Sequence, residues 1–182
     1  NVSGNSGTTG ATYSCEIPGN SKLATAPRNS SPIINPNDAI AICAGTQFTF
    51  DFSAVDPDGT DSLVYSLCEA YVGGGTEPGE CYTCTSPAPT STPPFDFIRY
   101  RSGYSGGSPL GPSVTFNSKT GLLSGLAPRS VGQYVLTACV AEYRNGILIN
   151  THRKDIHIAV SDCKPLKAVL APDYVFCDDF NV

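Results

Sequence analysis

The sequence predicts an all-β fold, and three observations lead to this prediction. Gly (18) and Pro (15) are abundant in the 182 residues, and charged residues make up only 15%. This composition suits short strands joined by tight turns better than long helices. Residues 47–55 alternate between apolar and polar side chains, with Phe48, Phe50 and Phe52 on one face. No segment shows the i, i+3, i+4, i+7 apolar spacing of an amphipathic helix.

The expected strands can be placed in order along the chain. Ala11–Ile17 alternates like a strand, residues 18–38 contain four prolines and read as a loop, and Asn145-Gly146 is typical of a type I′ hairpin turn. The other expected strands are Ala39–Cys43, Gln47–Val55, Leu63–Leu67, Val114–Phe116, Thr120–Gly125, Gly132–Tyr143, Ile147–Thr151, Asp155–Ser161 and Tyr174–Cys177. Their number and spacing favour a Greek-key β-sandwich.

The same patterns predict a sandwich with an insert and two extensions. Residues 31–163 would form the sandwich, residues 1–30 an N-terminal extension, and residues 164–182 a C-terminal linker or strand. Residues 69–112 hold no long periodic run, and an insert of this length is unusual in a compact domain unless it is functional or internally stapled. We expect this insert to be stapled by a disulfide and to carry one or two short strands.

The eight cysteines indicate disulfides and therefore an oxidising, extracellular environment. Cys81 and Cys84 are the only close pair, whereas a zinc ribbon needs a second such pair. A redox-active reading of this pair is disfavoured because the sequence around it lacks the βαβ pattern that such motifs use. A structural disulfide closing a loop is the preferred interpretation.

Two disulfide pairs can be suggested from the expected strands. Cys68 and Cys139 would lie on the same face if their strands are antiparallel neighbours, and Cys43 and Cys163 close the first and last strands of the sandwich. Eight cysteines allow many connectivities, so the sequence does not fix the pairing. The remaining cysteines are Cys15, Cys81, Cys84 and Cys177.

Charge and hydropathy exclude several classes of partner. The formal net charge of −5 argues against binding to nucleic acid or to an anionic membrane. The longest apolar stretches are far below the roughly 18 residues of a transmembrane helix, so we expect no membrane insertion. A chain that begins with Asn1 and lacks a signal peptide fits either a mature protein or a fragment.

A short acidic turn is the strongest candidate for a binding site. Asp56, Asp58 and Asp61 lie within six residues, around a Pro and a Gly that favour a tight turn. Three neighbouring carboxylates repel one another unless a cation or a donor relieves them, and carboxylates on a turn suit calcium. Calcium takes six to eight oxygens, so further ligands are needed, with Glu142 as the first candidate. Other candidates are Asn145, Asp51, Asp173, Asp178 and Asp179. The alternative is a solvated turn without metal.

Two further clusters have competing interpretations. Arg99, Tyr100 and Tyr104 form an aromatic and basic group that would stack on a sugar or anchor a partner, or else pack the insert onto the sandwich. His152, Asp155 and His157 suggest a triad or a metal site, but the alternation of His157 with its apolar neighbours and the basic residues beside His152 favour a surface strand.

Several motifs carry a resemblance to a known family. The segment DPDGTDSLVYSL, the later TGLLSGLAP and the segment VGQYVLT resemble Ig-like, cadherin-like repeats of bacterial cell-surface proteins. The longer segments ICAGTQFTFDFSAVDPDG and CVAEYRNGILINTHRKDI, with GYS and PLG between them, resemble Bacteroidetes surface proteins associated with gliding motility. The resemblance covers residues 31–163 and implies an Ig-like sandwich in a long, modular protein exported by type IX secretion. In that family the turn usually reads DPDGD, whereas Thr60 is inserted here before Asp61. Asp61–Leu63 also resembles the O-glycosylation motif of Bacteroidetes, which would place a sugar on Ser62.

These observations together predict a non-enzymatic building block of an extracellular bacterial surface fibre or adhesin. Residues 1–17 resemble the tail of a preceding domain and are candidates for donating a strand to a neighbouring copy, so we expect a homo-oligomer or filament. The alternative is a glycan- or protein-binding module that uses the insert 69–112. An enzyme is disfavoured because the sequence contains no nucleophile elbow, catalytic carboxylate pair or zinc signature.

Overall fold

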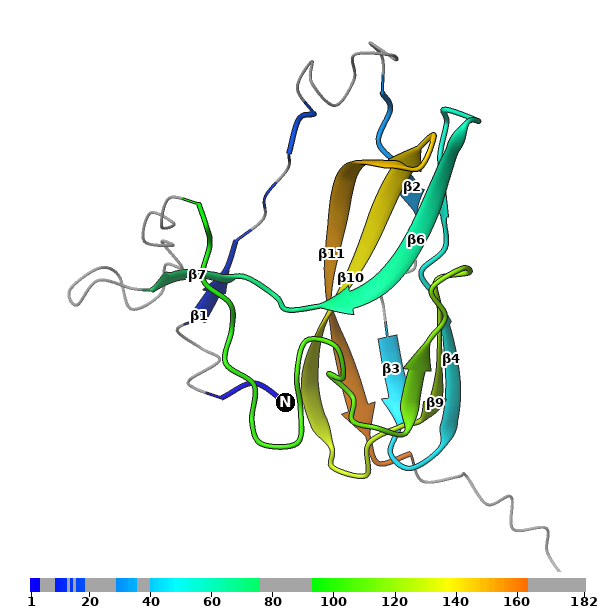
Figure 1. The fold of residues 1–182 in the computed structure, drawn as a ribbon. Coiled ribbons are helices and arrows are strands. Elements are labelled where there is room, and N and C mark those ends of the chain that lie inside the picture. The colour runs from blue at the N-terminus through cyan, green and yellow to red at the C-terminus, as the bar shows by residue number, and fades with distance from the viewer. Residues whose placement is uncertain are drawn as a thin grey trace, which may run out of the picture.

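The computed structural model describes residues 1–3, 9–12, 14, 16–18, 29–35, 40–75 and 93–163. Every regular element in these residues is a β-strand, which confirms the all-β prediction. The described part of the chain contains no helix capable of crossing a membrane. Figure 1 shows a body of two sheets with a smaller lobe at one side.

In the part of the chain that the structure describes, eleven strands form four sheets. The largest has the order β3-β11-β10-β6, the second has the order β4-β9-β8, and two short pairs are β1-β7 and β2-β5. β3 runs parallel to β11, whereas the other pairs are antiparallel. The bounds are β1 Thr9–Ala11, β2 Ile33–Ile34, β3 Ile40–Cys43, β4 Gln47–Asp51, β5 Ala54–Val55, β6 Asp61–Cys68, β7 Val72–Gly75, β8 Val114–Phe116, β9 Leu122–Leu126, β10 Gly132–Arg144 and β11 Ile147–Ser161.

The two larger sheets enclose one hydrophobic core, and we call this part of the molecule the body. Alternate residues of β10 point inward, including Leu136 and Ala138, because successive side chains of a strand face opposite sides. Leu123 of β9 and Phe52, which follows β4, belong to the same core. The remaining core residues are Ile42, Leu110, Ala127, Tyr134, Ile156, Ile158 and Val160. The body is therefore held together mainly by burial of apolar side chains.

The hairpin that joins β10 to β11 has the expected turn. Asn145 and Gly146 both adopt positive φ angles, 51° and 77°, as a type I′ turn requires. The register shifts between Glu142 and Tyr143, so that a bulge interrupts the pairing just before the hairpin end. Bulges re-aim neighbouring side chains, and this one lies beside the acidic turn.

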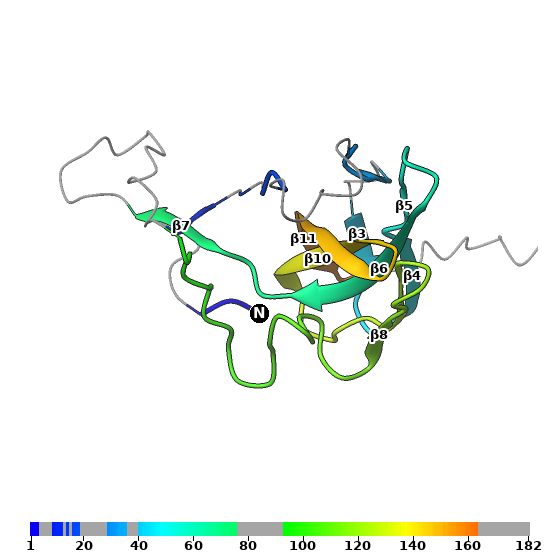
Figure 2. The same ribbon diagram turned by 45° about the horizontal axis from the view of Figure 1, so that its top comes forward.

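The lobe is built from residues far apart in the sequence, namely 1–3, 9–12, 71–75 and 93–101. β1 pairs with β7, Tyr71 pairs with Phe97, and Val2 pairs with Tyr100. Figure 2 shows the lobe projecting from the body beyond the end of β6, where the insert begins. The insert thus carries the short strand expected of it. Its residues 76–92, including Cys81 and Cys84, lie outside the described part, as does the expected strand at 174–177.

We call the described residues between 1 and 35 the strap (Figure 1). Its first part, residues 1–3 and 9–12, belongs to the lobe, and its last part, residues 29–35, lies at the hairpin end of the body. Along its course Asn150 Nδ2 donates a hydrogen bond to the carbonyl of Glu16 at 2.8 Å. Farther on, β2 pairs with β5. The strap therefore contacts β7 in the lobe, then β11, and finally β5 and the acidic turn.

Four expected strands differ from the structure. The first strand is Thr9–Ala11, earlier than expected, where it meets the glycines of β7 and Thr12 bonds the carbonyl of Val72. The expected strand 47–55 breaks after Asp51, because the Asp51 carboxylate accepts the Ser53 amide and the Phe52 amide donates to Gly121. The two strands expected between 147 and 161 are one continuous strand.

Candidate functional site

Four carboxylates meet at the end of the body where β6 begins and β10 ends. Asp56 and Asp58 come from the turn between β5 and β6, Asp61 is the first residue of β6, and Glu142 lies near the end of β10. Each offers one oxygen, and these oxygens lie within 4.8 Å of one another. The structure therefore brings together the four residues that the sequence suggests as metal ligands.

Local hydrogen bonds fold the turn so that its carboxylates converge. Asp56 Oδ1 accepts the amide of Asp58 at 2.8 Å, and the Asp58 carbonyl accepts the amides of Thr60 and Asp61. The inserted Thr60 occupies one more position of the turn. Asp61 still reaches the cluster, and its side chain is fully buried.

Arg144 supplies the main positive charge of the cluster. Its register partner in the sheet is Asp61, and its Nε and Nη2 atoms bind the two oxygens of Asp61, each at 2.6 Å. Nη2 also lies 3.2 Å from Asp58 Oδ2 and 2.8 Å from Asn29 Oδ1. Paired hydrogen bonds of this kind between Arg and a carboxylate are strong and fix the geometry of both groups.

His152 belongs to this site, so the surface interpretation of this residue is wrong. Its Nε2 lies 3.0 Å from Glu142 Oε2, and its side chain is only 15% exposed. The physical reason is strand parity: His152 lies opposite Val140 on β10, and Val140 faces the core. His157, in contrast, is exposed as expected, and Asp155 accepts a hydrogen bond from Thr137.

Two buried oxygens of the cluster accept no hydrogen bond. These are Asp56 Oδ2 and Glu142 Oε1. Burial raises the pKa of Asp56 and of Glu142, because water no longer stabilises the charged forms. The hydrogen bonds from Arg144 lower the pKa of Asp61 and, in return, the pKa of Arg144 is raised. Buried acceptors without a partner are rare and call for an explanation.

The strap closes the site from the side. The Ser30 amide donates to Asp58 Oδ2 at 2.5 Å, and the Ser30 hydroxyl lies 3.3 Å from Asp58 Oδ1. Among the other suggested ligands, Asn145 forms the exposed hairpin turn and Asp51 binds the Ser53 amide. Asp173, Asp178 and Asp179 lie outside the described residues.

Two disulfides join the pairs suggested from the sequence. Cys43–Cys163 links the end of β3 to the residue after β11, with 5.2 Å between the Cα atoms. Cys68–Cys139 links neighbouring strands of one sheet, with 6.1 Å between the Cα atoms. The described residues contain no other cysteine, since Cys15, Cys81, Cys84 and Cys177 lie outside them. The two disulfides indicate a non-reducing environment.

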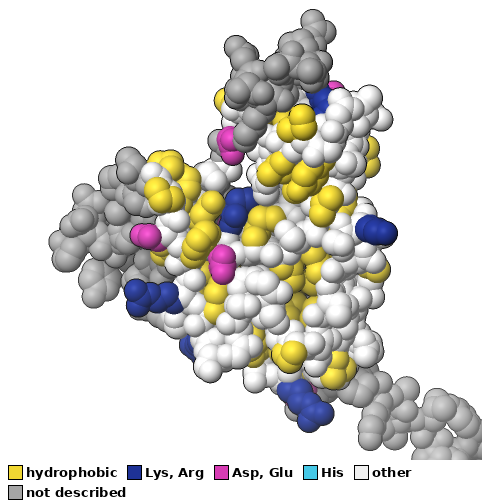
Figure 3. Space-filling model, viewed as in Figure 1, with side chains coloured by type: hydrophobic (Ala, Val, Ile, Leu, Met, Phe, Trp, Pro, Cys, Tyr) yellow, Lys and Arg dark blue, Asp and Glu magenta, His cyan; other side chains and the backbone are white. Residues whose placement is uncertain are grey.

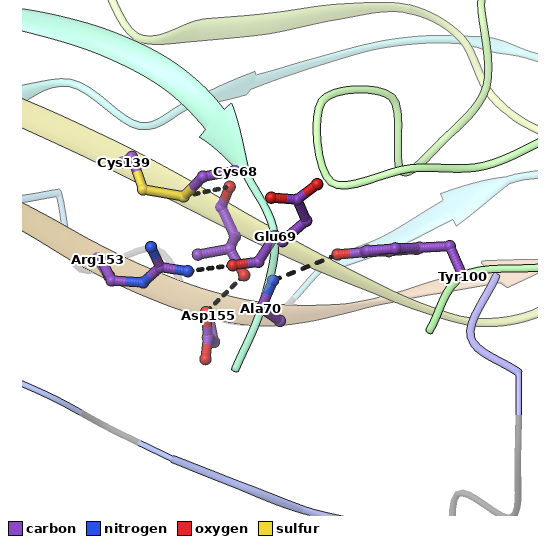
Figure 4. The surroundings of a disulfide bond; sticks show 8 residues. Cys68, Glu69, Ala70, Tyr100, Cys139, Arg153 and Asp155 are labelled. Carbon is purple, nitrogen blue, oxygen red and sulfur yellow. Dashed lines mark hydrogen bonds between the residues drawn. A yellow bond between two sulfur atoms is a disulfide. The ribbon is translucent and has the colours of Figure 1, made fainter. Parts of the chain in front are cut away.

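The disulfide Cys68–Cys139 lies at the root of the lobe (Figure 4). Immediately after it, the carbonyl of Glu69 accepts a hydrogen bond from Arg153, whose guanidinium lies 4.0 Å from the centre of the Tyr71 ring. The Ala70 amide donates to the Tyr100 hydroxyl at 3.4 Å. These contacts attach the first residues of the insert to β11 and to the returning part of the insert.

The predicted ligand-binding residues Arg99, Tyr100 and Tyr104 do not share one surface. Tyr100 is partly buried and its hydroxyl faces Ala70, while Tyr104 packs edge-to-face on Tyr134 against the core. Arg99 is exposed, and its carbonyl accepts the Ser3 amide. The two tyrosines thus pack the insert onto the molecule. Ser62, the suggested glycosylation site, is exposed on β6.

A different set of aromatic residues lines a hollow on the lobe. Tyr71 stacks on Phe97 with 5.4 Å between ring centres, and Phe95 meets Tyr71 edge-on. With Pro93 and Pro94 they border a hollow of about 390 Å³. Phe97 is 51% exposed. On the face shown in Figure 3, hydrophobic side chains lie on both the lobe and the body, with only a few charged side chains.

Arg144 and His152 are the main site residues that the sequence interpretation missed. The position of both residues could have been predicted from strand alternation. Arg144 continues the series of inward-facing residues of β10, and His152 lies on the same face of β11 as the buried Ile156. A charged residue on the inward face of a strand requires a partner. Asn29 carries no such signal, since nothing in its sequence surroundings places it at the turn.

Comparisons with known proteins place this chain in no family. No family model and no curated protein matches it. One solved structure, a nucleoside hydrolase-related hypothetical protein from Saccharophagus degradans associated with carbohydrate metabolism, is similar over 73% of this chain, with a TM-score of 0.40 and 18% identity. The chain spans only 26% of that protein's length. A likeness at this level supports no inference about fold or activity.

Proposed function

We propose that this chain is a non-enzymatic structural domain of an extracellular bacterial surface fibre or adhesin. The observation that carries the proposal is the strap, whose first residues make backbone hydrogen bonds to the lobe, while the Asn1 side chain bonds the body at Val135 and Pro109. Ser3 donates to the carbonyl of Arg99 at 2.8 Å and Arg101 donates to the carbonyl of Asn1 at 2.9 Å. Contacts of this kind are those of a strand added to a sheet edge.

The strand order supports an Ig-like Greek-key sandwich for the body. In Ig domains the B, E and D strands share one sheet and the C, F and G strands share the other. The orders β4-β9-β8 and β6-β10-β11 correspond to these two groups. The disulfide differs from that of antibody domains, since Cys68–Cys139 joins neighbours within one sheet. The resemblance to gliding-motility-associated repeats adds surface anchoring and type IX secretion to the proposal.

The strap gives the proposal its assembly mode. The pairing of β1 with β7 can be made by the strap of the same chain or by that of a second copy, because the same backbone bonds form in either case. When each copy donates its strap to the next, the contact is head-to-tail and does not close, so a filament forms. The partner is therefore a second copy of this chain.

The burial of two carboxylates of the acidic cluster supports a structural rather than a catalytic role for them. The side chains of Asp61 and Glu142 are fully buried, and Arg144 binds Asp61 through both of its oxygens. A general acid or base must come within hydrogen-bond reach of its substrate. Carboxylates enclosed in this way have no exposed face on which a substrate would dock.

Light scattering at increasing protein concentration tests the assembly. The full chain is expected to form oligomers, and a chain lacking residues 1–18 is expected to remain monomeric with an unchanged near-ultraviolet circular dichroism spectrum of the body. A second variant, with residues 1–12 replaced by Gly and Ser, preserves chain length and is expected to behave like the deletion. A full chain that stays monomeric at every concentration contradicts the proposal, as do variants that assemble normally.

The aromatic hollow favours a glycan-binding module as the second candidate function. Exposed aromatic rings stack on the apolar faces of sugar rings, and Phe97 and Tyr71 present such a surface. Under this alternative, Phe97→Ala abolishes binding on a glycan array, while Leu122→Ala, which removes a partly exposed side chain of the body, leaves it unchanged. Absence of binding to every glycan contradicts the alternative.

A further inference from the structure

We propose that Asp56, Asp58, Asp61 and Glu142 bind one calcium ion, which fastens the strap to the hairpin end of the body. The proposal does not depend on whether the strap binds its own body or that of a second copy, because all four carboxylates belong to the body. It rests on the spacing of the four carboxylates, on two buried acceptors without partners, and on the charge balance of the cluster.

The spacing of the oxygens fits the size of calcium. One oxygen from each of the four residues lies within 4.8 Å of the others. Calcium–oxygen distances are about 2.3–2.6 Å, so ligands on opposite sides of one ion are about 4.6–5.2 Å apart. Magnesium binds oxygen at about 2.0–2.1 Å and would need a tighter cluster. The all-oxygen donor set also suits calcium better than zinc.

The two acceptors without partners point to an ion rather than to a solvated turn. Glu142 is 0% exposed, yet its Oε1 accepts no hydrogen bond, and the same holds for the buried Asp56 Oδ2. Each belongs to a carboxylate of the cluster, and the two come from different elements, β10 and the β5–β6 turn. A cation between them satisfies both acceptors, which would otherwise each carry a desolvation cost.

Arg144 and His152 do not balance the charge of the cluster. Within the described part of the chain, four carboxylates face one guanidinium and one imidazole, so these groups, when the carboxylates are ionised, keep at least two negative charges even when His152 is protonated. Arg144 directs its bonds to Asp58 and Asp61, and His152 binds the other oxygen of Glu142. One divalent cation removes the remaining excess.

The ion would couple the strap to the body through Asp58 and Arg144. Asp58 accepts the amide of Ser30, and Arg144 donates to the side chain of Asn29. When calcium fixes Asp58, the bond from Ser30 has a rigid acceptor. Calcium is therefore expected to slow hydrogen exchange at the amide of Ser30 and in the adjoining β2.

Calcium titration of the chelator-treated full chain tests the site. We expect one bound ion per chain by calorimetry, and a melting temperature raised by roughly 5–10 °C at 100 times the dissociation constant. Magnesium at the same concentration should give a smaller shift. Calcium that neither binds nor raises the melting temperature overturns the proposal.

Matched variants distinguish this site from other carboxylates. Glu142→Gln and Asp56→Asn keep the side-chain shapes and are expected to weaken calcium binding at least tenfold and to abolish the thermal shift. Asp96→Asn removes an exposed carboxylate of the lobe and is expected to bind calcium as the parent chain does. Because the readout is the difference with and without calcium, altered stability of a variant does not obscure it. Both cluster variants retaining the full shift would overturn the assignment.

Discussion

The body and the lobe are stabilised in different ways. The body encloses a continuous core from two sheets, in which Leu123, Leu136 and Ile158 are completely buried. The lobe has short strands, three clustered aromatic rings and bonds between backbone groups of distant segments. Burial of apolar surface supplies most of the folding free energy, whereas exchange of water for protein hydrogen bonds contributes little net.

This difference implies that the lobe and the strap open more easily than the body. Regions with few buried apolar contacts exchange and unfold locally at a lower cost than the global unfolding free energy. The disulfide Cys68–Cys139 and the bond from Arg153 to Glu69 hold the chain to the body just before the lobe begins. We therefore expect local opening to stop at this point and not to spread into β6. A strap that opens while the body stays folded is what strand exchange requires.

The largest expected loss of stability comes from truncating Leu123, the buried one of two adjacent leucines of β9. Leu123→Ala should lower the free energy of unfolding by about 2–5 kcal/mol, because Leu123 is 0% exposed and its removal leaves a cavity. Leu122, 37% exposed on the other face, is the matched control, and Leu122→Ala should cost less than about 1 kcal/mol. Urea denaturation measures both. Similar losses would show that the core is not where the structure places it.

Removing either disulfide should have the next largest effect. Replacing both cysteines of a pair by Ala should destabilise the protein by about 2–4 kcal/mol, since both close long loops, with sequence separations of 120 and 71 residues. Loss of Cys68–Cys139 should also speed proteolysis within the lobe, whereas loss of Cys43–Cys163 should not. If the lobe is cleaved equally fast in the two variants, Cys68–Cys139 does not stabilise the lobe.

The smallest effect is expected at the contact between β11 and the lobe. Arg153→Ala removes a cation–π contact and a bond to the Glu69 carbonyl, which should cost about 1 kcal/mol. Hydrogen exchange should accelerate in β7, while exchange in the centre of β10 should hardly change. Arg129→Ala, a substitution of an exposed arginine of the body, is the control. Faster exchange throughout β10 would mean that the two regions unfold together.

The sequence predicted the body better than the lobe, for a physical reason. The alternation of Phe48 and Phe50 and the Asn145-Gly146 turn are local signals for strands and a hairpin, and both occur in the structure. Strand parity also brought Cys68 and Cys139 to one face. The strap meets its partners through backbone groups and through Asn, Ser and Thr side chains that bond backbone carbonyls. Such bonds can form with any residue, so the polar sequence of the strap contains no signal for its partner.

The candidate site shows the same division. The three aspartates were found because they share one turn, and Glu142 because it lies near the hairpin. Arg144 and His152 required the alternation of β10 and β11 to be followed past the apolar residues. The contact of Ser30 with Asp58 joins residues without a sequence pattern between them.

Native-state hydrogen exchange on the full chain tests the central claim, which is that the strap and lobe open while the body remains folded. Amides of β1 and β7 should exchange roughly 100-fold faster than those at the centre of β10, with little dependence on denaturant. The β10 amides should exchange only by global unfolding. Equal protection of β7 and β10, with the same denaturant dependence, would contradict the claim, because the strap would then be released only by unfolding the whole molecule.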